Sequence, residues 1–130
     1  MVFVTGGIAS GKRTFAATCG FTRERITTCT APNDIPASEA VFDTQELVTG
    51  TETAAELEAL ADALARKEVV IATEIGLGVV PLDAKERAVR EAAGRLACLL
   101  VKRADTVVRC CCGIPQALKG NLQPTDTEQH

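Results

Sequence analysis

A glycine-rich segment near the start of the chain has the residue types and spacing of a phosphate-binding loop. Gly6 is followed by four residues and then by Gly11 and Lys12, directly after a short apolar run. Glycines let backbone N–H groups converge on phosphate oxygens, and the lysine ammonium reaches the β- and γ-phosphates of a nucleotide. The alternative is a plain glycine-rich turn. The segment predicts that GTP or ATP is bound by Gly6, Gly7, Ile8, Ala9, Ser10, Gly11 and Lys12, with Arg13 and Thr14 beside them.

The residue after Lys12 departs from this motif. A Ser or Thr is expected there because its hydroxyl holds Mg²⁺, whereas this chain has Arg13. Thr14 is one residue further on, about 100° around the helix, so it cannot take the same position. Arg13 could repel Mg²⁺, replace part of its charge or point into solvent. Anion binding by the loop stays a prediction, because it needs only backbone N–H groups and Lys12.

Two acidic residues follow predicted strands, at the edge where parallel sheets bind ligands. Asp43 comes after Ala-Val-Phe and could hold Mg²⁺ through water, or cap a helix that starts at Thr44. Glu74 follows an apolar run and could act as a base, a metal partner or a ribose contact, or take a capping or ion-pairing role. Asp43 and Glu74, together with Lys12, are the candidate catalytic residues. The two carboxylates are also the candidate Mg²⁺ ligands.

Strands and helices are predicted to alternate along the chain. Apolar stripes with a spacing of three and four residues indicate a helix around Leu57–Leu64 and a second one over about residues 84–104. A shorter helix is expected over about residues 12–18, and residues 30–38 are expected to form a loop. Strands are expected at residues 1–5, 25–29, 40–43, 68–73 and 106–112, the last of them closing the fold. This order predicts an α/β domain with a mainly parallel sheet.

Length and composition limit the remaining possibilities. The 130 residues suit one domain, predicted here over residues 1–118, with a mobile polar tail over residues 119–130. A net charge of −3 argues against a nucleic-acid partner. No apolar run is long enough for a transmembrane helix and no signal peptide is visible, so we expect no membrane partner and a cytoplasmic location.

The cysteines and the histidine do not suggest a metal site. Three of the six cysteines are consecutive, at Cys110, Cys111 and Cys112, and there is no Cys-x-x-Cys pair. The single histidine is His130. We expect reduced, mostly buried thiols.

With these segments in place, the chain resembles the adenosylcobinamide kinase/adenosylcobinamide-phosphate guanylyltransferase family of cobalamin biosynthesis. The resemblance is carried by Val4–Gly7 and Ser10–Lys12, and more distinctively by the run from Glu74 to Pro81. It continues along the second long helix through Arg87, Arg90 and Gly94-Arg95, whose arginines are expected on a solvated face, and then through Ala104-Asp105, Gly113–Pro115 and Lys119.

The resemblance implies a P-loop nucleotide hydrolase-like, recombinase-type three-layer domain that assembles as a homotrimer. It implies phosphorylation of adenosylcobinamide from GTP or ATP, followed by transfer of GMP through a guanylylated histidine. This chain is shorter than typical relatives, and its only histidine is His130, so the guanylyltransferase step is expected to be lost. The alternative is a non-catalytic homologue that binds nucleotide, corrinoid or a partner subunit.

Overall fold

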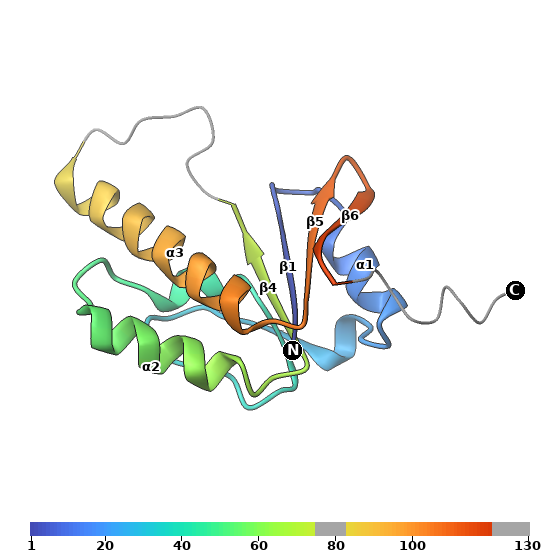
Figure 1. Cartoon of the computed structure of the whole chain (residues 1–130), viewed down its shortest axis with the longest axis horizontal. Coiled ribbons are helices and arrows are strands. Elements are labelled where there is room, and N and C mark those ends of the chain that lie inside the picture. The colour runs from blue at the N-terminus through green and yellow to red at the C-terminus, as the bar shows by residue number, and fades with distance from the viewer. Residues whose placement is uncertain (75–82, 121–130) are drawn as a thin grey trace, which may run out of the picture.

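The computed structural model describes residues 1–74 and 83–120 of the chain. These residues form six strands and three α-helices (Figure 1). The strands are β1 (Val2–Gly6), β2 (Ile26–Thr28), β3 (Ala40–Phe42), β4 (Val69–Thr73), β5 (Thr106–Cys111) and β6 (Ile114–Lys119). The helices are α1 (Lys12–Thr18), α2 (Ala54–Leu64) and α3 (Ala84–Arg103), and two 3-10 turns occur at η1 (Arg23–Arg25) and η2 (Thr44–Leu47).

One sheet with the order β2-β3-β4-β1-β5-β6 contains all six strands. Every neighbouring pair is parallel except β5 and β6, which form an antiparallel hairpin. The central strands are apolar on both faces, as parallel strands covered by helices must be. Because β1 lies between β4 and β5, the loop after β1 emerges beside the carboxyl ends of both neighbours.

Helices cover both faces of the sheet, so the domain has three layers (Figure 1). Phe3, Val70 and Val107 point into a core cluster with α2 and α3. Their chain neighbours Val4, Ile71 and Val108 point the other way, into a cluster with Phe15 and Ala16 of α1. This alternation of side chains along each strand confirms the predicted α/β, P-loop-like architecture.

The two long helices begin and end close to their predicted limits. Thr53 caps α2 in a capping box, in which its side chain accepts from the Glu56 N–H and the Glu56 carboxylate accepts from the Thr53 N–H. Asp83 caps α3 by accepting from the Glu86 N–H at 2.7 Å. Arg103 near the end of α3 pairs with Glu58 and Asp62 of α2, which links the two helices.

The prediction that residues 106–112 form the last strand is wrong. Cys112 adopts the left-handed conformation and Gly113 follows it with φ +80°, so the chain turns back and pairs as β6. Lys119 ends this strand, and its ammonium donates to the carbonyls of Val101 and Lys102 at the end of α3. Residues 121–130, including His130, lie outside the described residues, so the predicted mobile tail stays a prediction.

The thiols are less buried than expected. Cys29 and Cys110 are buried, whereas Cys98, Cys111 and Cys112 are exposed. The reason lies in the strand alternation, because Cys110 points toward α1 while Cys111 points away from it and Cys112 sits in the turn.

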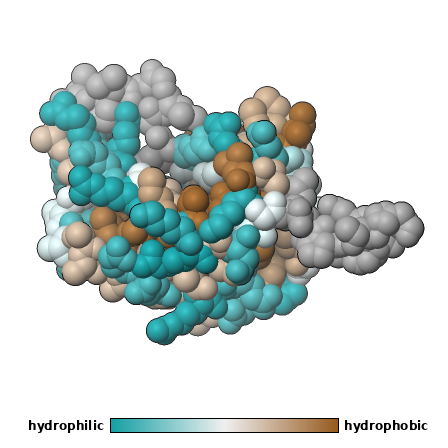
Figure 2. Space-filling model, in the orientation of Figure 1, coloured by the Kyte–Doolittle hydropathy of each residue, from teal (hydrophilic) through white to brown (hydrophobic). Residues whose placement is uncertain are grey.

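The surface facing the viewer in Figure 2 is largely hydrophilic, with apolar residues showing between α3 and the sheet and at the tip of the β5–β6 hairpin. The hairpin includes Ile114, which is 68% exposed. Among the described residues no helix has the length and apolar character needed to cross a membrane.

Candidate functional site

The glycine-rich loop joins β1 to α1 and packs against the β5–β6 turn. A Cβ on Gly6 would lie 2.5 Å from the carbonyl oxygen of Cys110, so the close approach of β5 requires glycine here. Gly11 has φ +99° and precedes α1, and a Cβ there would lie 3.0 Å from Cα of Gly113. The Gly113 N–H in turn donates to the Ser10 carbonyl at 3.0 Å. The hairpin that the sequence did not predict therefore supports the loop.

Lys12 is buried at the base of this loop, where only 4% of its surface is exposed. Its ammonium donates to the Gly7 carbonyl and lies 3.4 Å from Ser10 Oγ. Burial lowers the pKa of Lys12, and the nearby Asp43 carboxylate partly offsets that effect. Helical geometry leaves the first N–H groups of α1 without intrahelical partners, since the first such bond runs from Phe15 N–H to the Gly11 carbonyl. The loop thus combines a buried cation with backbone donors, which suits an anion.

Arg13 does not extend into solvent. Its guanidinium carbon lies 3.9 Å from the centroid of the Phe42 ring, and Nη2 donates to Thr28 Oγ1 at 3.2 Å. This stacked geometry is the one a guanidinium prefers over an aromatic face. Arg13, Thr14 and Phe42 line a cavity of about 350 Å³ beside the loop. Arg13 stands where the motif has a hydroxyl residue, and its guanidinium lies at the ends of β2 and β3, beside Thr28 and Phe42.

Asp43 follows β3 with φ +60° and makes no side-chain cap on η2, so the capping alternative is not what the structure shows. Its Oδ1 accepts from Thr73 Oγ1 at 2.7 Å, across the ends of β3 and β4. Asp43 and Thr73 share a cavity of about 430 Å³ with Lys12. The sequence-predicted lysine and aspartate therefore lie in one place, at the carboxyl edge of the sheet.

Glu74 forms an ion pair with Arg109 of β5. Arg109 Nε donates to Oε2 at 2.9 Å and Nη2 donates to Oε1 at 3.0 Å, while Thr5 Oγ1 lies 3.5 Å from Oε2. The hydrogen bonds from Arg109 hold the pKa of Glu74 below its usual value of 4.5. An ionised carboxylate held in this way is a weak base, and the ion-pairing alternative is the one observed. The Glu74 backbone N–H also donates to the Gly6 carbonyl at 2.8 Å, so the pair holds the start of the loop.

Sequence reasoning missed Arg109, although a signal for it was present. Arg109 is the one charged residue in the apolar run of β5, on the face opposite Val108 and Cys110. A charge inside a central strand needs a partner on a neighbouring element. Finding Glu74 as that partner required the order β4-β1-β5, which the sequence pattern does not specify.

Replacing Glu74 with glutamine is expected to remove a pH-dependent part of the stability. Because the folded-state pKa is lowered, this stabilisation is complete above pH 4.5 and is lost as the pH falls through the folded pKa. Urea unfolding of both proteins across this range should show a difference in unfolding free energy that shrinks on acidification. In the Arg109→Gln background the same difference should be absent, and an unchanged difference there would argue against the pair.

The residues at the carboxyl edge do not form a ready-made metal cage. Within the described ranges no group of three or more His, Cys, Asp or Glu residues could hold a metal ion. Mg²⁺ is commonly bound by one or two carboxylates together with substrate phosphates and water. Asp43 fits that role, whereas both oxygens of Glu74 accept hydrogen bonds from Arg109. The rest of the run after Glu74, residues 75–82, lies outside the described residues.

The three layers, the strand order and the loop after β1 define an α/β domain of P-loop-like architecture. The family model of cobinamide kinase / cobinamide phosphate guanyltransferase matches residues 37–118, and the chain belongs to this family. The match supports a nucleotide-related function in cobalamin biosynthesis. No curated protein matches the chain. Asp43, Glu74 and Arg109 lie within the matched residues, whereas the glycine-rich loop lies before them.

Proposed function

We propose that this protein binds GTP or ATP through the loop Gly6–Lys12 and transfers the γ-phosphoryl group to the hydroxyl of adenosylcobinamide. The observation that carries the proposal is that Lys12, Asp43 and Thr73 line one cavity beside the loop. Phosphoryl transfer depends on positioning and on neutralising charge, which a buried ammonium and backbone N–H groups supply. Family membership gives the acceptor, since a cobinamide is the substrate in the family's description.

Each residue has a separate task in this proposal. Lys12 exchanges its contact with the Gly7 carbonyl for the β- and γ-phosphates, and the loop N–H groups bind the remaining oxygens. Asp43 would hold Mg²⁺, which neutralises charge on the phosphates when bound. Glu74 is a positioning residue, because its pair with Arg109 and its N–H fix the strand from which the loop starts.

The guanylyl transfer that the family also performs is proposed to be absent. Transfer through a guanylylated histidine needs an imidazole beside the nucleotide, and the sequence contains a single histidine, His130. The expected product is therefore phosphorylated cobinamide and not GDP-cobinamide. Mass spectrometry after incubation with cobinamide, GTP and Mg²⁺ tests this. Accumulation of GDP-cobinamide would contradict the loss of the second step, and absence of any phosphorylated product would contradict the kinase proposal.

The Asp43→Asn variant is expected to lose the Mg²⁺-dependent part of its nucleotide affinity. Removing a carboxylate that holds the metal should weaken GTP binding in Mg²⁺ by about tenfold, with little change in EDTA. Titration calorimetry with GTP under both conditions measures this. Glu46→Gln is the matched control, because Glu46 is an exposed acidic residue that lines the same cavity. Equal losses with and without Mg²⁺ would show that Asp43 does not act through the metal.

A second candidate function is ligand binding without catalysis. The stacking of Arg13 on Phe42 favours it, because a cation stands where the family motif places the hydroxyl that holds Mg²⁺. This candidate predicts nucleotide binding that is independent of Mg²⁺ and yields no product. Arg13→Ser should then create Mg²⁺-dependent binding, whereas the kinase proposal expects such dependence in the unaltered protein.

By family membership we further propose a cytoplasmic protein that assembles as a homotrimer. Light scattering of the purified chain gives the assembly mass directly, and a monomer would contradict this part of the proposal.

A further inference from the structure

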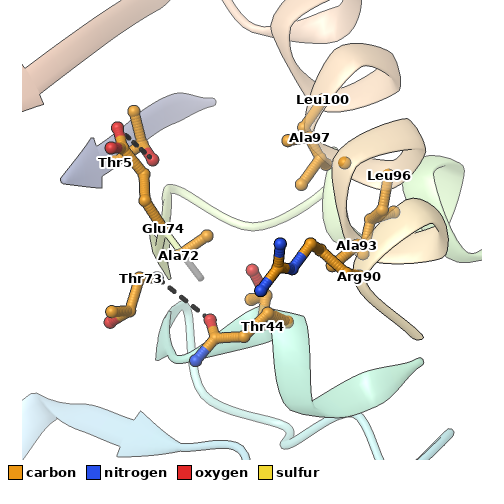
Figure 3. Close-up of a pocket in the computed structure, with 12 residues that line it drawn as sticks. Thr5, Thr44, Ala72, Thr73, Glu74, Arg90, Ala93, Leu96, Ala97 and Leu100 are labelled. Carbon is orange, nitrogen blue, oxygen red and sulfur yellow. Dashed lines mark hydrogen bonds between the residues drawn. The ribbon is translucent and has the colours of Figure 1, made fainter. Parts of the chain in front are cut away.

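A second cavity lies next to the proposed nucleotide site, between α3 and the carboxyl end of β4 (Figure 3). Its volume is about 320 Å³. Ala72 of β4 and Leu96 and Leu100 of α3 form apolar walls, and the polar residues include Thr73 and Arg90. Figure 3 shows Arg90 reaching from α3 toward Thr44.

The cavity exists because α3 presents small residues to this part of the sheet. Ala93, Gly94 and Ala97 line it, and a Cβ added at Gly94 would meet no atom within 4 Å. Leu96 and Leu100 of the same helix are buried and form the apolar wall of the cavity. Protein interiors are normally close-packed, so a cavity of this size at the carboxyl edge of the sheet is a candidate ligand-binding site.

The two cavities share a thin partition. Gln45 and Thr73 line both of them, and the Thr73 N–H donates to Gln45 Oε1 at 3.0 Å. A molecule in the second cavity therefore lies one side chain away from the cavity that contains Lys12 and Asp43. This is the relation that an acceptor and a phosphoryl donor require.

The lining and the size identify the kind of molecule. The interior suits an aliphatic chain, while the Gln45 amide and the Arg90 guanidinium suit hydroxyl or amide oxygens. Among the described residues Arg90 makes no salt bridge, although its charge interacts with that of Glu86 one turn earlier on α3. Its guanidinium is therefore a candidate donor to a ligand. At roughly 30 Å³ per small group, the cavity holds about ten non-hydrogen atoms. A corrin macrocycle is several times larger and does not fit.

We propose that this cavity binds the short aliphatic arm of the acceptor that carries its hydroxyl, while the macrocycle stays outside. The assignment rests on the proposed function for the identity of the acceptor. The arm would enter beside Arg90 and present its hydroxyl at the Gln45–Thr73 partition, toward the γ-phosphate held by Lys12. Recognition would thus depend on the arm and not on the ring.

The test compares variants that fill the cavity with a variant that leaves it open. Ala93→Leu and Ala97→Leu add bulk to the cavity, while Cys98→Leu, the control, places a leucine on the exposed side of α3. Cobinamide binding is measured by equilibrium dialysis and GTP binding by calorimetry. We expect cobinamide affinity to fall by roughly tenfold or more in both filled variants. GTP affinity and the control should stay within about twofold of the unaltered protein.

Two further measurements test the same cavity without filling it. Arg90→Gln leaves the volume open and should weaken cobinamide binding several-fold, even if a filled variant fails to fold. N-(2-hydroxypropyl)acetamide, an isolated arm, should compete with cobinamide, whereas N-propylacetamide, which lacks the hydroxyl, should compete less well.

The outcomes separate this assignment from the nucleotide proposal. Unchanged cobinamide affinity in both filled variants would overturn the assignment, as would a protein that binds GTP but neither cobinamide nor the isolated arm. A protein whose cobinamide binding is lost in the filled variants but which binds no GTP would support the cavity and overturn the nucleotide site.

Discussion

Lys12→Ala should reduce GTP affinity by about 10- to 100-fold and reduce phosphoryl transfer to background. The expected loss is large because Lys12 is a buried cation, and the hydrogen bonds that we propose it donates to phosphate oxygens would form away from water. Removing the ammonium also leaves the transferred group without its main fixed positive charge. Titration calorimetry with GTP, followed by product detection with cobinamide, measures both effects.

The matched control is Lys102→Ala. Lys102 is exposed near the end of α3, so its removal changes the net charge equally and should leave GTP affinity unaltered. If both variants bind GTP as well as the unaltered protein, the loop is not the nucleotide site. If both lose affinity to the same extent, the effect is one of overall charge.

Gly6→Ala is expected to destabilise the fold by about 2 kcal/mol and to weaken nucleotide binding as well. A methyl group at this position would lie 2.5 Å from the Cys110 carbonyl oxygen and would also contact Ser10 Oγ. Backbone atoms cannot move aside as a flexible side chain can, so β1 and β5 must separate or the loop must shift. Urea unfolding gives the change in free energy, and GTP titration gives the effect on the loop.

Gly7→Ala is a control one residue away. A Cβ at Gly7 would meet no atom within 4 Å, so stability should change by less than about 0.5 kcal/mol. Equal destabilisation by both alanines would mean that the close approach of β5 is not the cause.

The elements with a strong periodic pattern were predictable from the sequence. The stripe through Leu57 and Leu64 gave α2, and the alanine and leucine repeat gave α3 with an end within one residue. The apolar run after Glu68 gave β4, because a strand buried on both faces has no polar alternation. Such patterns show which side chains of a segment are buried. They can be recognised without knowing where in the sheet or on which face of it the segment lies.

The hairpin strand β6 could not be predicted in the same way. It contains Pro115 and several residues that favour helices, and it is tolerated because an edge strand need not pair on both sides. Its reversal depends on Cys112 in a conformation that cysteine seldom adopts. The contact of Gly113 with the loop is therefore a product of tertiary structure.

The candidate site also contains residues that local sequence patterns predict and contacts that they do not. Lys12 and Asp43 were identified from a loop motif and a strand end, and the structure places both on one cavity. The pairing of Glu74 with Arg109 and the position of Arg13 over Phe42 join residues far apart in sequence. Such pairs follow from the strand order, so only the fold reveals them.

Thermal unfolding of the unaltered protein with GTP, ATP, GDP and GMP tests the central claim, that the loop Gly6–Lys12 holds nucleotide phosphates. A ligand at about 100 times its dissociation constant adds roughly 2.7 kcal/mol, enough to raise the midpoint by several degrees. We predict such a rise with GTP or ATP and a much smaller one with GMP, which lacks the β- and γ-phosphates that we propose Lys12 binds. No rise with any of the four nucleotides, or an equal rise with GMP, would contradict the account.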